Sequence, residues 1–233
     1  LLEADGHQVV SLWRYTAVRI PHPGVVWGDL NLDDMRRVVG LALPDIIIHL
    51  GALASNAQAN AHPVEAMQTN AVGTARLVEA AKAYNVKAFI LASSSEVYAR
   101  PNERYALNPY AASKIAAEES VIASGLPFVI SRAFNTYGRG PINLPRFVVD
   151  EAIHQALTTG EIRLRDYSPK RDFLFRDDHV GAYRKIVQAI VEGRDIFGSV
   201  FSFGTGEARR IGDMAALVAA MTGAVVMKAT GEH

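Results

Sequence analysis

The segment VKAFILASSSEVY, residues 86–98, carries the clearest fold signal in the chain. Its first part, residues 86–92, is a nearly unbroken apolar run, which is typical of a strand buried on both faces of a parallel sheet. Three serines, residues 93–95, follow at the carboxyl end of that strand. Open α/β sheets bind ligands at this edge, so the segment predicts a parallel sheet with a polar site beside it.

Outward from this segment, short β-rich runs alternate with longer helical ones. This succession predicts a doubly wound α/β fold, with right-handed crossovers between parallel strands. Further strands are predicted at residues 9–12, 25–27, 46–50 and 128–130, and helices at 32–43, 64–84 and 109–123.

The regular alternation of short strands and longer helices ends after about Asn135. The remaining pattern predicts a second, smaller α/β lobe, so that residues 1–134 form one domain and residues 135–233 mainly the other, with some segments returning to the first. In this part of the chain, helices are predicted at 144–157, 178–191 and 211–221, and short strands at 162–164, 173–175, 200–203 and 224–226.

Composition excludes several classes of protein. The 233 residues include 24 basic and 24 acidic ones, and this zero net charge gives no support to nucleic-acid or anionic-membrane binding. The absence of cysteine excludes a disulfide scaffold, thiolate metal ligands and a thiol nucleophile. The longest run without Asp, Glu, Lys, Arg or His, residues 214–227, is shorter than the roughly 20 residues of a membrane span. We therefore expect a cytoplasmic protein without a metal site, in which Asp177 and Asp178 begin a helix.

Tyr110 and Lys114 stand four residues apart in a predicted helix and so share one face of it. A nearby ammonium group favours phenolate and lowers the tyrosine pKa from its usual value near 10. Such a tyrosine can act as an acid or base near neutral pH. The alternative is an ordinary exposed pair on an amphipathic helix.

Several further segments accompany this pair in a fixed order. They are residues 28–30, 44–50, 70–74, 94–98, 132–138, 171–173 and 203–207. With these segments, the sequence resembles the extended short-chain dehydrogenase/reductase family, and specifically its NAD-dependent nucleotide-sugar epimerases and dehydratases. The resemblance implies a Rossmann-like doubly wound sheet in a dinucleotide-binding domain, residues 1–134, and a C-terminal substrate-binding lobe, residues 135–233. It also implies a homodimer and a nucleotide-diphosphate sugar as substrate.

The resemblance assigns roles to individual residues. Tyr110 corresponds to the catalytic acid/base, Lys114 to its electrostatic partner and a ligand of the nicotinamide ribose, and Ser94 to a hydroxyl bonded to the reacting sugar oxygen. Each has a simpler alternative: Ser94 as a strand cap, Asn135 as a turn former and Arg171 as a surface salt-bridge partner. Implied cofactor contacts are Asp29 and Leu30 at the adenine, Leu50, Gly51 and Ala52 at the phosphates and ribose, and Asn70 and Phe134 nearby; implied substrate contacts are Asn135, Asn143 and Arg171.

Glu96 bears on the choice of reaction. In this family a hydride leaves sugar C4 and a 4-keto intermediate forms, and dehydratases place an acidic residue two positions after the catalytic Ser or Thr. Ser94 and Glu96 match that spacing and favour a 4,6-dehydratase. Some decarboxylases and epimerases share the Ser-Glu-Val-Tyr run, so a 4-epimerase or a 4-keto reductase stays open. A non-catalytic dinucleotide sensor is the alternative from another class.

Arg14 bears on the cofactor. Family members that select NAD usually end the second strand with an acidic residue, whereas this sequence has Trp13 and then Arg14. An arginine can pair with a 2′-phosphate, so NADP is favoured over NAD. A solvent-exposed Arg14 without a ligand is the alternative.

The sequence also departs from the family pattern. The glycine-rich phosphate loop between the first strand and the first helix is absent, and Ala99 replaces the glycine usual after Val-Tyr. Residues 1–7 match the end of a first helix. We therefore expect a longer native chain, with a strand and phosphate loop within about 20 residues upstream of Leu1, and with residues beyond His233.

Overall fold

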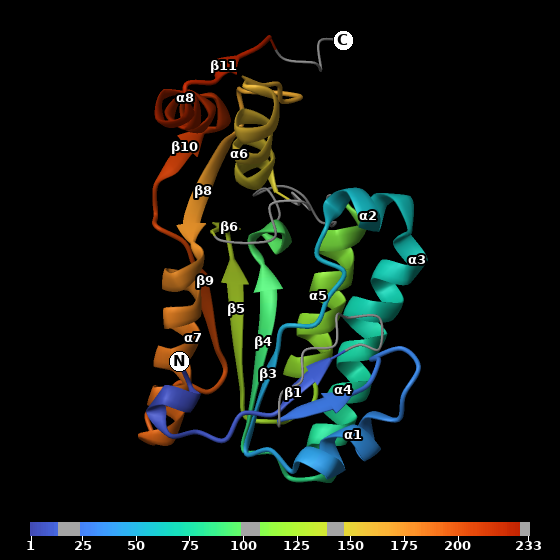
Figure 1. Cartoon of the computed structure of the whole chain (residues 1–233). Helices are drawn as coiled ribbons and strands as arrows, with labels where there is room; N and C mark the ends of the chain where they lie inside the picture. Colours follow the sequence, from blue (N-terminus) through green and yellow to red (C-terminus); the bar gives the residue numbers. More distant parts are fainter. Residues whose placement is uncertain (14–23, 99–107, 139–146, 229–233) are drawn as a thin grey trace. The chain divides into compact units, whose positions relative to one another are not determined.

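The structure is a computed structural model that describes residues 1–13, 24–98, 108–138 and 147–228 (Figure 1). The chain forms two compact units. Unit 1 comprises Leu1–Arg132 and Tyr183–Ser202, and unit 2 comprises Ala133–Ala182 and Phe203–His233.

A four-stranded sheet is the centre of unit 1. Its first two strands run parallel, with Ile46 opposite Ala88 and His49 opposite Leu91. The interior strands are apolar, and the side chains of Phe89 and Ile130 are fully buried. The strands follow the order β3 (Ile46–His49), β4 (Ala88–Ser94), β5 (Phe128–Ala133) and β9 (Ser199–Phe203).

Helices pack on both faces of this sheet. α4 (Gly73–Ala83) and α5 (Pro109–Ile122) lie on one side, and α7 (Arg176–Val191) lies on the other (Figure 1). The hydroxyls of Tyr183 on α7 and Ser131 on β5 are 2.7 Å apart in a buried hydrogen bond. This arrangement confirms the predicted doubly wound α/β fold.

A second, two-stranded parallel sheet completes unit 1. It pairs β1 (Ser11–Trp13) with β2 (Val25–Trp27), and it is followed by α1 (Met35–Ala42), whose first turn is capped by the Asp34 carboxylate. In the described part of the chain, β1 and β3 are not hydrogen-bonded to each other, so unit 1 holds two parallel sheets. The short 3₁₀ turn η1 (Glu3–Asp5) stands where the sequence suggests the end of a helix.

The helix predicted over residues 64–84 is confirmed, but it contains a π-helical turn. It consists of α3 (Pro63–Ala66), a π-helical turn η2 (Met67–Val72) and α4, and the unpredicted helix α2 (Asn56–Ala61) precedes it. Pro63 has no N–H to donate and so begins a new helix after His62. A π turn inserts one residue without changing the apolar composition, which is why the sequence pattern does not reveal it.

Unit 2 is a smaller α/β body. β8 (Lys170–Phe175) pairs in parallel with β6 (Asn135–Tyr137) and antiparallel with β10 (Ala208–Arg210). β6 and β10 were not predicted, because their sequences, Asn-Thr-Tyr and Ala-Arg-Arg, contain no apolar run. The unit also contains α6 (Val148–Thr159), β7 (Glu161–Ile162), α8 (Ile211–Thr222) and β11 (Val225–Val226). α6 and α8 bury a shared apolar core with β7.

Candidate active site

α5 presents Tyr110 and Lys114 in its first turns. The helix begins where the Asn108 side chain accepts a hydrogen bond from the Ala111 N–H at 2.8 Å, with Pro109 in the first helical position. Tyr110 is 8% exposed and Lys114 is 3% exposed. The pair is therefore buried, which excludes the alternative of an ordinary exposed pair on a helix surface.

Lys114 points at the carboxyl end of β4. Its Nζ donates a 2.6 Å hydrogen bond to the Ala92 carbonyl. Burial lowers the pKa of Lys114 to about 8, against the opposing effect of the Glu118 carboxylate one turn later. The ammonium form still predominates at neutral pH, and two of its three N–H donors remain for other partners.

Tyr110 differs from the expectation in its acidity. Burial raises the pKa of the Tyr110 phenol, a hydrogen bond with Ser94 lowers it, and the charge of Glu96 raises it further. The net direction is upward, so the expected lowering by Lys114 is wrong for this structure. The physical reason is that desolvation penalises the phenolate, while the ammonium is directed at the Ala92 carbonyl.

Ser94 and Glu96 follow directly after the buried strand. The Ser94 hydroxyl caps the 3₁₀ turn η3 (Ser95–Val97) by accepting a hydrogen bond from the Glu96 N–H at 3.2 Å, and it also bonds the phenol. Asn108 donates from Nδ2 to Glu96 Oε2 at 3.4 Å. Sequence reasoning missed Asn108, although an Asn-Pro step at a predicted helix start is a recognisable capping signal. Four side chains therefore meet at one edge of the sheet.

The residues expected at the cofactor's adenosine half lie on two neighbouring loops. After β2, the Asp29 carboxylate accepts a hydrogen bond from the Asn31 N–H at 2.8 Å. After β3, Leu50 and Gly51 are exposed and Ala52 is half-buried. A Cβ on Gly51 would lie 3.2 Å from the Leu30 side chain, so a glycine lets the two loops approach closely.

Asn70 lies in the π turn and is 1% exposed. Its amide oxygen accepts a hydrogen bond from the Leu53 N–H at 2.7 Å. Its amide nitrogen donates to the Leu53 carbonyl at 3.1 Å and to the Ser113 hydroxyl at 2.9 Å. The side chain expected beside the cofactor thus makes three hydrogen bonds within the protein.

Unit 2 contains the predicted substrate residues that the structure describes. Asn135 is half-buried in β6, and its neighbour Phe134, which was predicted as a cofactor contact, donates its N–H to the Phe203 carbonyl at 2.9 Å. Arg171 is exposed in β8, where it stands opposite Arg209 of β10. Among the described residues, Arg171 pairs with no carboxylate, so the alternative of a surface salt bridge finds no support there. Arg14 and Asn143 lie outside the described residues.

Asp172, next to Arg171, anchors the late glycine-containing segment. Its carboxylate accepts three hydrogen bonds of 2.8 Å, from the N–H and hydroxyl of Thr205 and from the N–H of Gly206. Burial acts to raise the pKa of Asp172, but these hydrogen bonds outweigh it and hold the pKa below its usual value. A Cβ on Gly204 would lie 2.6 Å from the carboxylate, so this close approach requires glycine.

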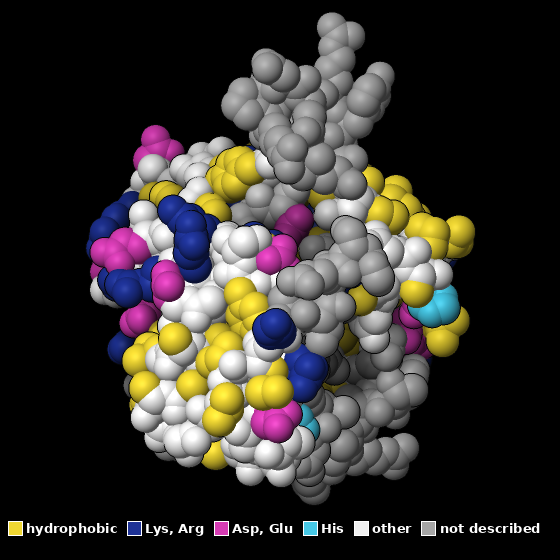
Figure 2. All heavy atoms as spheres, turned by 90° about the horizontal axis from the view of Figure 1, so that it is seen from above, with side chains coloured by type: hydrophobic (Ala, Val, Ile, Leu, Met, Phe, Trp, Pro, Cys, Tyr) yellow, Lys and Arg dark blue, Asp and Glu magenta, His cyan; other side chains and the backbone are white. Residues whose placement is uncertain are grey.

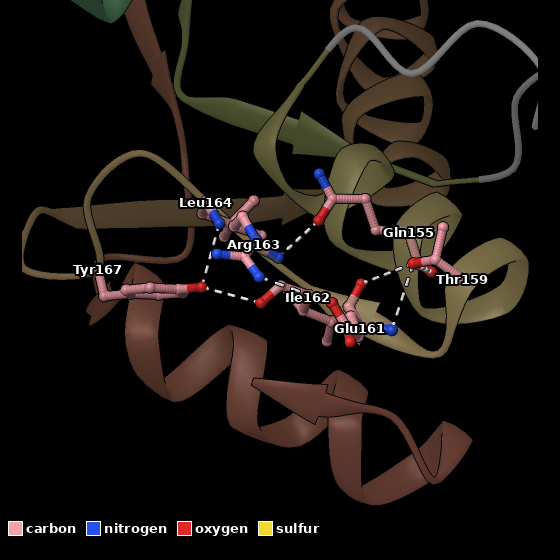
Figure 3. Close-up of polar contacts among 7 residues, drawn as sticks. All are labelled: Gln155, Thr159, Glu161, Ile162, Arg163, Leu164 and Tyr167. Atoms are coloured by element: carbon pink, nitrogen blue, oxygen red, sulfur yellow. Dashed lines mark hydrogen bonds and ion pairs between the residues drawn. The ribbon is translucent and has the colours of Figure 1, made fainter. Parts of the chain in front are cut away.

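A pocket of about 390 Å³ opens within unit 2. Its wall includes the apolar side chains of Phe147, Leu164 and Ile211 and the charged groups of Glu151 and Asp166. Figure 3 shows the polar contacts beside it: the Tyr167 hydroxyl accepts from the Leu164 N–H and donates to the Ile162 carbonyl, each at 3.0 Å. Gln155 accepts from the Arg163 N–H at 2.6 Å. These bonds hold the segment after β7 in place.

Surface charge, metal-ligating side chains and helix hydropathy are further features of the described residues that bear on function. Lys and Arg are interspersed with Asp and Glu on the face shown in Figure 2, in keeping with the balanced composition. Among the described residues, no three His, Asp or Glu side chains are grouped so that they could hold a metal ion. Over the same residues, no helix has the length and apolar character needed to cross a membrane.

Comparison with known proteins agrees with this geometry. Over 198 residues the chain is 29% identical to the GDP-6-deoxy-D-mannose reductase of Pseudomonas aeruginosa, covering 76% of this chain and 63% of that protein. Over 195 residues it is 31% identical to the dTDP-glucose 4,6-dehydratase of Neisseria gonorrhoeae, covering 73% of this chain and 54% of that protein. The chain thus spans less than two thirds of the length of these relatives.

A solved structure and a family match complete the comparison. The UDP-glucose 4-epimerase of Thermus thermophilus, in complex with NAD, superposes with a TM-score of 0.78 at 25% identity, covering 99% of this chain and 82% of that chain. Residues 1–201 match the NAD dependent epimerase/dehydratase family. With its parallel sheet, its Tyr110–Lys114 pair and a match over most of its length, the chain belongs to the NAD dependent epimerase/dehydratase family.

Proposed function

We propose that the protein is an NAD(P)-dependent enzyme that modifies a nucleotide-diphosphate sugar through a 4-keto intermediate. The single observation that supports this most strongly is the buried Tyr110 phenol, hydrogen-bonded to Ser94, with Lys114 one turn further along the same helix. A buried, polar cluster of this kind at the carboxyl edge of a parallel sheet is typical of a catalytic site.

The roles of the side chains follow from their chemistry. Tyr110, as phenolate, takes the proton of the sugar C4 hydroxyl, and the Ser94 hydroxyl hydrogen-bonds the same oxygen. Lys114 keeps two ammonium N–H donors besides its bond to the Ala92 carbonyl, and these can hold the ribose of a bound cofactor. A bound nicotinamide supplies the hydride acceptor that oxidation at C4 requires.

The loops after β2 and β3 fit a dinucleotide. The close approach of Gly51 to Leu30 brings the two loops together, with Asp29 next to Leu30 and Ala52 next to Gly51. A side chain at Gly51 would fill part of this space. NAD is supported by the family and by the Thermus structure. The preference for NADP rests on Arg14 in the sequence alone.

Dehydration is the reaction that we favour. Once C4 is a ketone, the C5 proton is acidic, and a carboxylate can remove it while the C6 hydroxyl leaves as water. The hydride first removed from C4 then returns to C6 and a proton returns to C5, so the product is a 4-keto-6-deoxy sugar and no net oxidation occurs. Glu96 supplies a carboxylate close enough to influence the phenol of Tyr110, and Asn108 holds one of its oxygens. The dehydratase relative supports this choice, whereas the reductase and epimerase relatives keep 4-keto reduction and 4-epimerisation as alternatives.

In unit 2, the pocket beside Leu164 and the exposed Arg171 support binding of the nucleotide part of the substrate. The pocket volume of about 390 Å³ and its apolar wall suit a nucleoside base. A guanidinium such as that of Arg171 can pair with diphosphate oxygens in a bidentate manner. We further infer a homodimer, which the exposed apolar side chains of Val64, Met67 and Val72 in unit 1 support.

Replacing Tyr110 with Phe tests the central claim. We expect turnover of a nucleotide-diphosphate sugar to fall by about 10³-fold, because the acid/base group is lost. Affinity for NADH and NADPH, measured by fluorescence titration, should persist, and tighter NADPH binding would support the role of Arg14. The control is Tyr84→Phe, the same change at an exposed tyrosine on the far end of α4.

Unchanged turnover in the Tyr110→Phe protein would overturn this assignment. Dinucleotide binding by the wild-type protein, with no turnover of GDP-, dTDP- or UDP-sugars, would instead favour the non-catalytic sensor. These two outcomes are separable, because binding and turnover are measured independently.

Replacing Glu96 with Gln tests the choice of reaction. The wild-type protein should release a 4-keto-6-deoxy product, identified by mass spectrometry from the loss of one water. Glu96→Gln should slow this loss by about 10²-fold, since the amide cannot take up the C5 proton. Glu119→Gln, on the exposed side of α5, is the matched control. A wild-type product that keeps its water, or net consumption of NADPH, would reject dehydration in favour of epimerisation or reduction.

A further inference from the structure

A buried hydrogen-bond network joins the π turn to the catalytic helix. At its centre, the Asn70 amide uses both N–H donors and one oxygen lone pair on two partners, the Leu53 backbone and the Ser113 hydroxyl. Asn70 and Ser113 are almost completely buried. A buried amide without hydrogen-bond partners would lower the stability of the fold. The three bonds therefore fix the orientation of the Asn70 side chain relative to the Leu53 backbone and the Ser113 hydroxyl.

The first path from Asn70 to Tyr110 passes through the backbone of α5. Ser113 Oγ accepts from the Asn70 amide at 2.9 Å and donates to the Tyr110 carbonyl at 2.8 Å. Tyr110 lies in the first turn of α5. Its backbone carbonyl accepts the helical hydrogen bond from the following turn, and the Ser113 hydroxyl adds a second bond to the same carbonyl. The Asn70 side chain therefore restrains the helical turn that carries the phenol.

The second path passes through the loop after β3. Both backbone groups of Leu53 bond to the Asn70 amide, at 2.7 and 3.1 Å. The Leu53 side chain packs against a small buried cluster made of Tyr110, Ala59 and Ala66. The position of the tyrosine ring and the course of this loop thus depend on the same amide.

A π turn explains how Asn70 reaches both partners. The extra residue in the turn over residues 67–72 widens the helix where it contacts α5. On the opposite side of Asn70, its carbonyl accepts a 2.6 Å hydrogen bond from the Thr74 hydroxyl, and that hydroxyl is 3.0 Å from His49 Nε2. The backbone and the side chain of Asn70 are therefore held by separate sets of bonds.

We propose that Asn70 is a positioning residue for Tyr110, which it orients through Ser113 and through Leu53. This inference rests on the proposed role of Tyr110 as the acid/base. It differs from the expectation, drawn from the resemblance, that Asn70 contacts the cofactor, because its amide is already bonded within the protein and is 1% exposed.

Two substitutions break hydrogen bonds of these two paths with little change in side-chain volume. Asn70→Asp keeps the shape, but a carboxylate cannot donate to Leu53 or Ser113, so the serine hydroxyl turns toward it and releases the Tyr110 carbonyl. Ser113→Ala removes only the first path. Thr74→Val is the matched control: it is equally buried and breaks the bond to the Asn70 carbonyl, but it leaves the three amide bonds intact.

The experiment measures kcat, KM, NADH affinity and the titration of the Tyr110 phenol by ultraviolet difference absorbance, with Tyr110→Phe as its blank. Asn70→Asp should lower kcat by about 10²-fold and Ser113→Ala by about tenfold, with KM and NADH affinity nearly unchanged and the phenol titration displaced. Thr74→Val should keep the wild-type kcat and phenol titration.

Three outcomes would overturn the proposal. The first is a loss of NADH affinity in Asn70→Asp with an undisturbed phenol titration, which would make Asn70 a cofactor contact. The second is a set of kinetic effects in Thr74→Val equal to those of the other two variants, which would make the role purely structural. The third is no effect in Asn70→Asp and Ser113→Ala. The phenol titration needs no turnover, so failure of this proposal and failure of the proposed enzyme activity are distinguishable.

Discussion

At the scale of the single residue, Lys114 shows how a functional group lowers the stability of the fold that carries it. The ammonium is buried beside β4 and bonds the Ala92 carbonyl, and the carboxylate of Glu118 lies one turn away. Glu118 itself forms a two-bond ion pair with Arg132 of β5, at 3.0 and 2.6 Å. Desolvation still dominates, since the pKa of Lys114 falls to about 8.

Replacing Lys114 with Met should therefore stabilise the protein at pH 7. The lowering from 10.5 to about 8 corresponds to roughly 3 kcal/mol, of which about 1 kcal/mol is offset by the lost hydrogen bond to Ala92. We expect the free energy of unfolding to rise by about 2 kcal/mol, measured by urea denaturation. Turnover should fall sharply in the same variant.

The pH dependence of this gain has a definite sign. The folded-state pKa of Lys114 lies below its unfolded value, so the wild-type protein carries the cost fully below pH 8 and loses it as the pH rises toward 10.5. The stability difference between Lys114→Met and wild type should shrink over that interval. A difference that stays constant from pH 7 to pH 10 would contradict the assignment of the cost to the buried charge.

At the scale of the element, β3 and α4 are joined by a buried histidine. The Thr74 hydroxyl donates to the Asn70 carbonyl, so it accepts from the N–H at His49 Nε2, and the imidazole is neutral with Nδ1 unprotonated. Burial, and to a smaller extent the charge of Lys114, lower the pKa of His49 to about 3. This buried, neutral environment makes His49 a packing residue that joins two elements of unit 1.

Stability should therefore fall as the pH drops below 6.5. In the unfolded chain His49 takes up a proton near pH 6.5, whereas in the folded protein it does so only near pH 3. By linkage, wild type should lose about 2 kcal/mol through this group between pH 7 and pH 5. His49→Gln keeps an N–H for Thr74 and should lack this loss. Urea denaturation of both proteins at the two pH values is the test, and equal losses would contradict the prediction.

At the scale of the whole molecule, the residues to which we assign different roles fall into different units. Unit 1 contains the described residues to which we assign acid/base catalysis, among them Tyr110 and Ser94, and unit 2 contains Arg171 and the pocket beside Leu164. Unit 1 also exposes apolar side chains along α3 and the π turn, including Val64 and Val72. Such exposed apolar surface favours association with another chain.

Sedimentation should therefore show twice the mass of one chain. Val72→Glu, which places a charge on this surface, should shift the protein to the mass of one chain. Leu217→Glu introduces the same charge at an exposed apolar position on α8 and should leave the mass unchanged. Monomeric wild-type protein, or an equal response of the two variants, would reject this surface as the dimer contact.

The sequence determined the parts of the protein that depend on local pattern. The apolar run before Ser94 identified a buried strand, and the four-residue spacing of Tyr110 and Lys114 placed both on one helix face. These inferences hold because strand burial and helical periodicity are read from neighbours along the chain. The short strands β6 and β10 were not predicted because they are mostly polar, and the π turn was not predicted because one inserted residue does not change the apolar composition of a helix.

Only the tertiary structure decided what surrounds the candidate site. The upward shift in the pKa of Tyr110 follows from burial and from its partners Ser94 and Glu96, which no spacing along the sequence reveals. The three bonds of Asn70 likewise join segments far apart in the chain, Leu53 and Ser113. The physical reason is that desolvation and hydrogen-bond geometry are set by distances in space. The residue types are written in the sequence, but their acidity and orientation arise only when the fold brings them together.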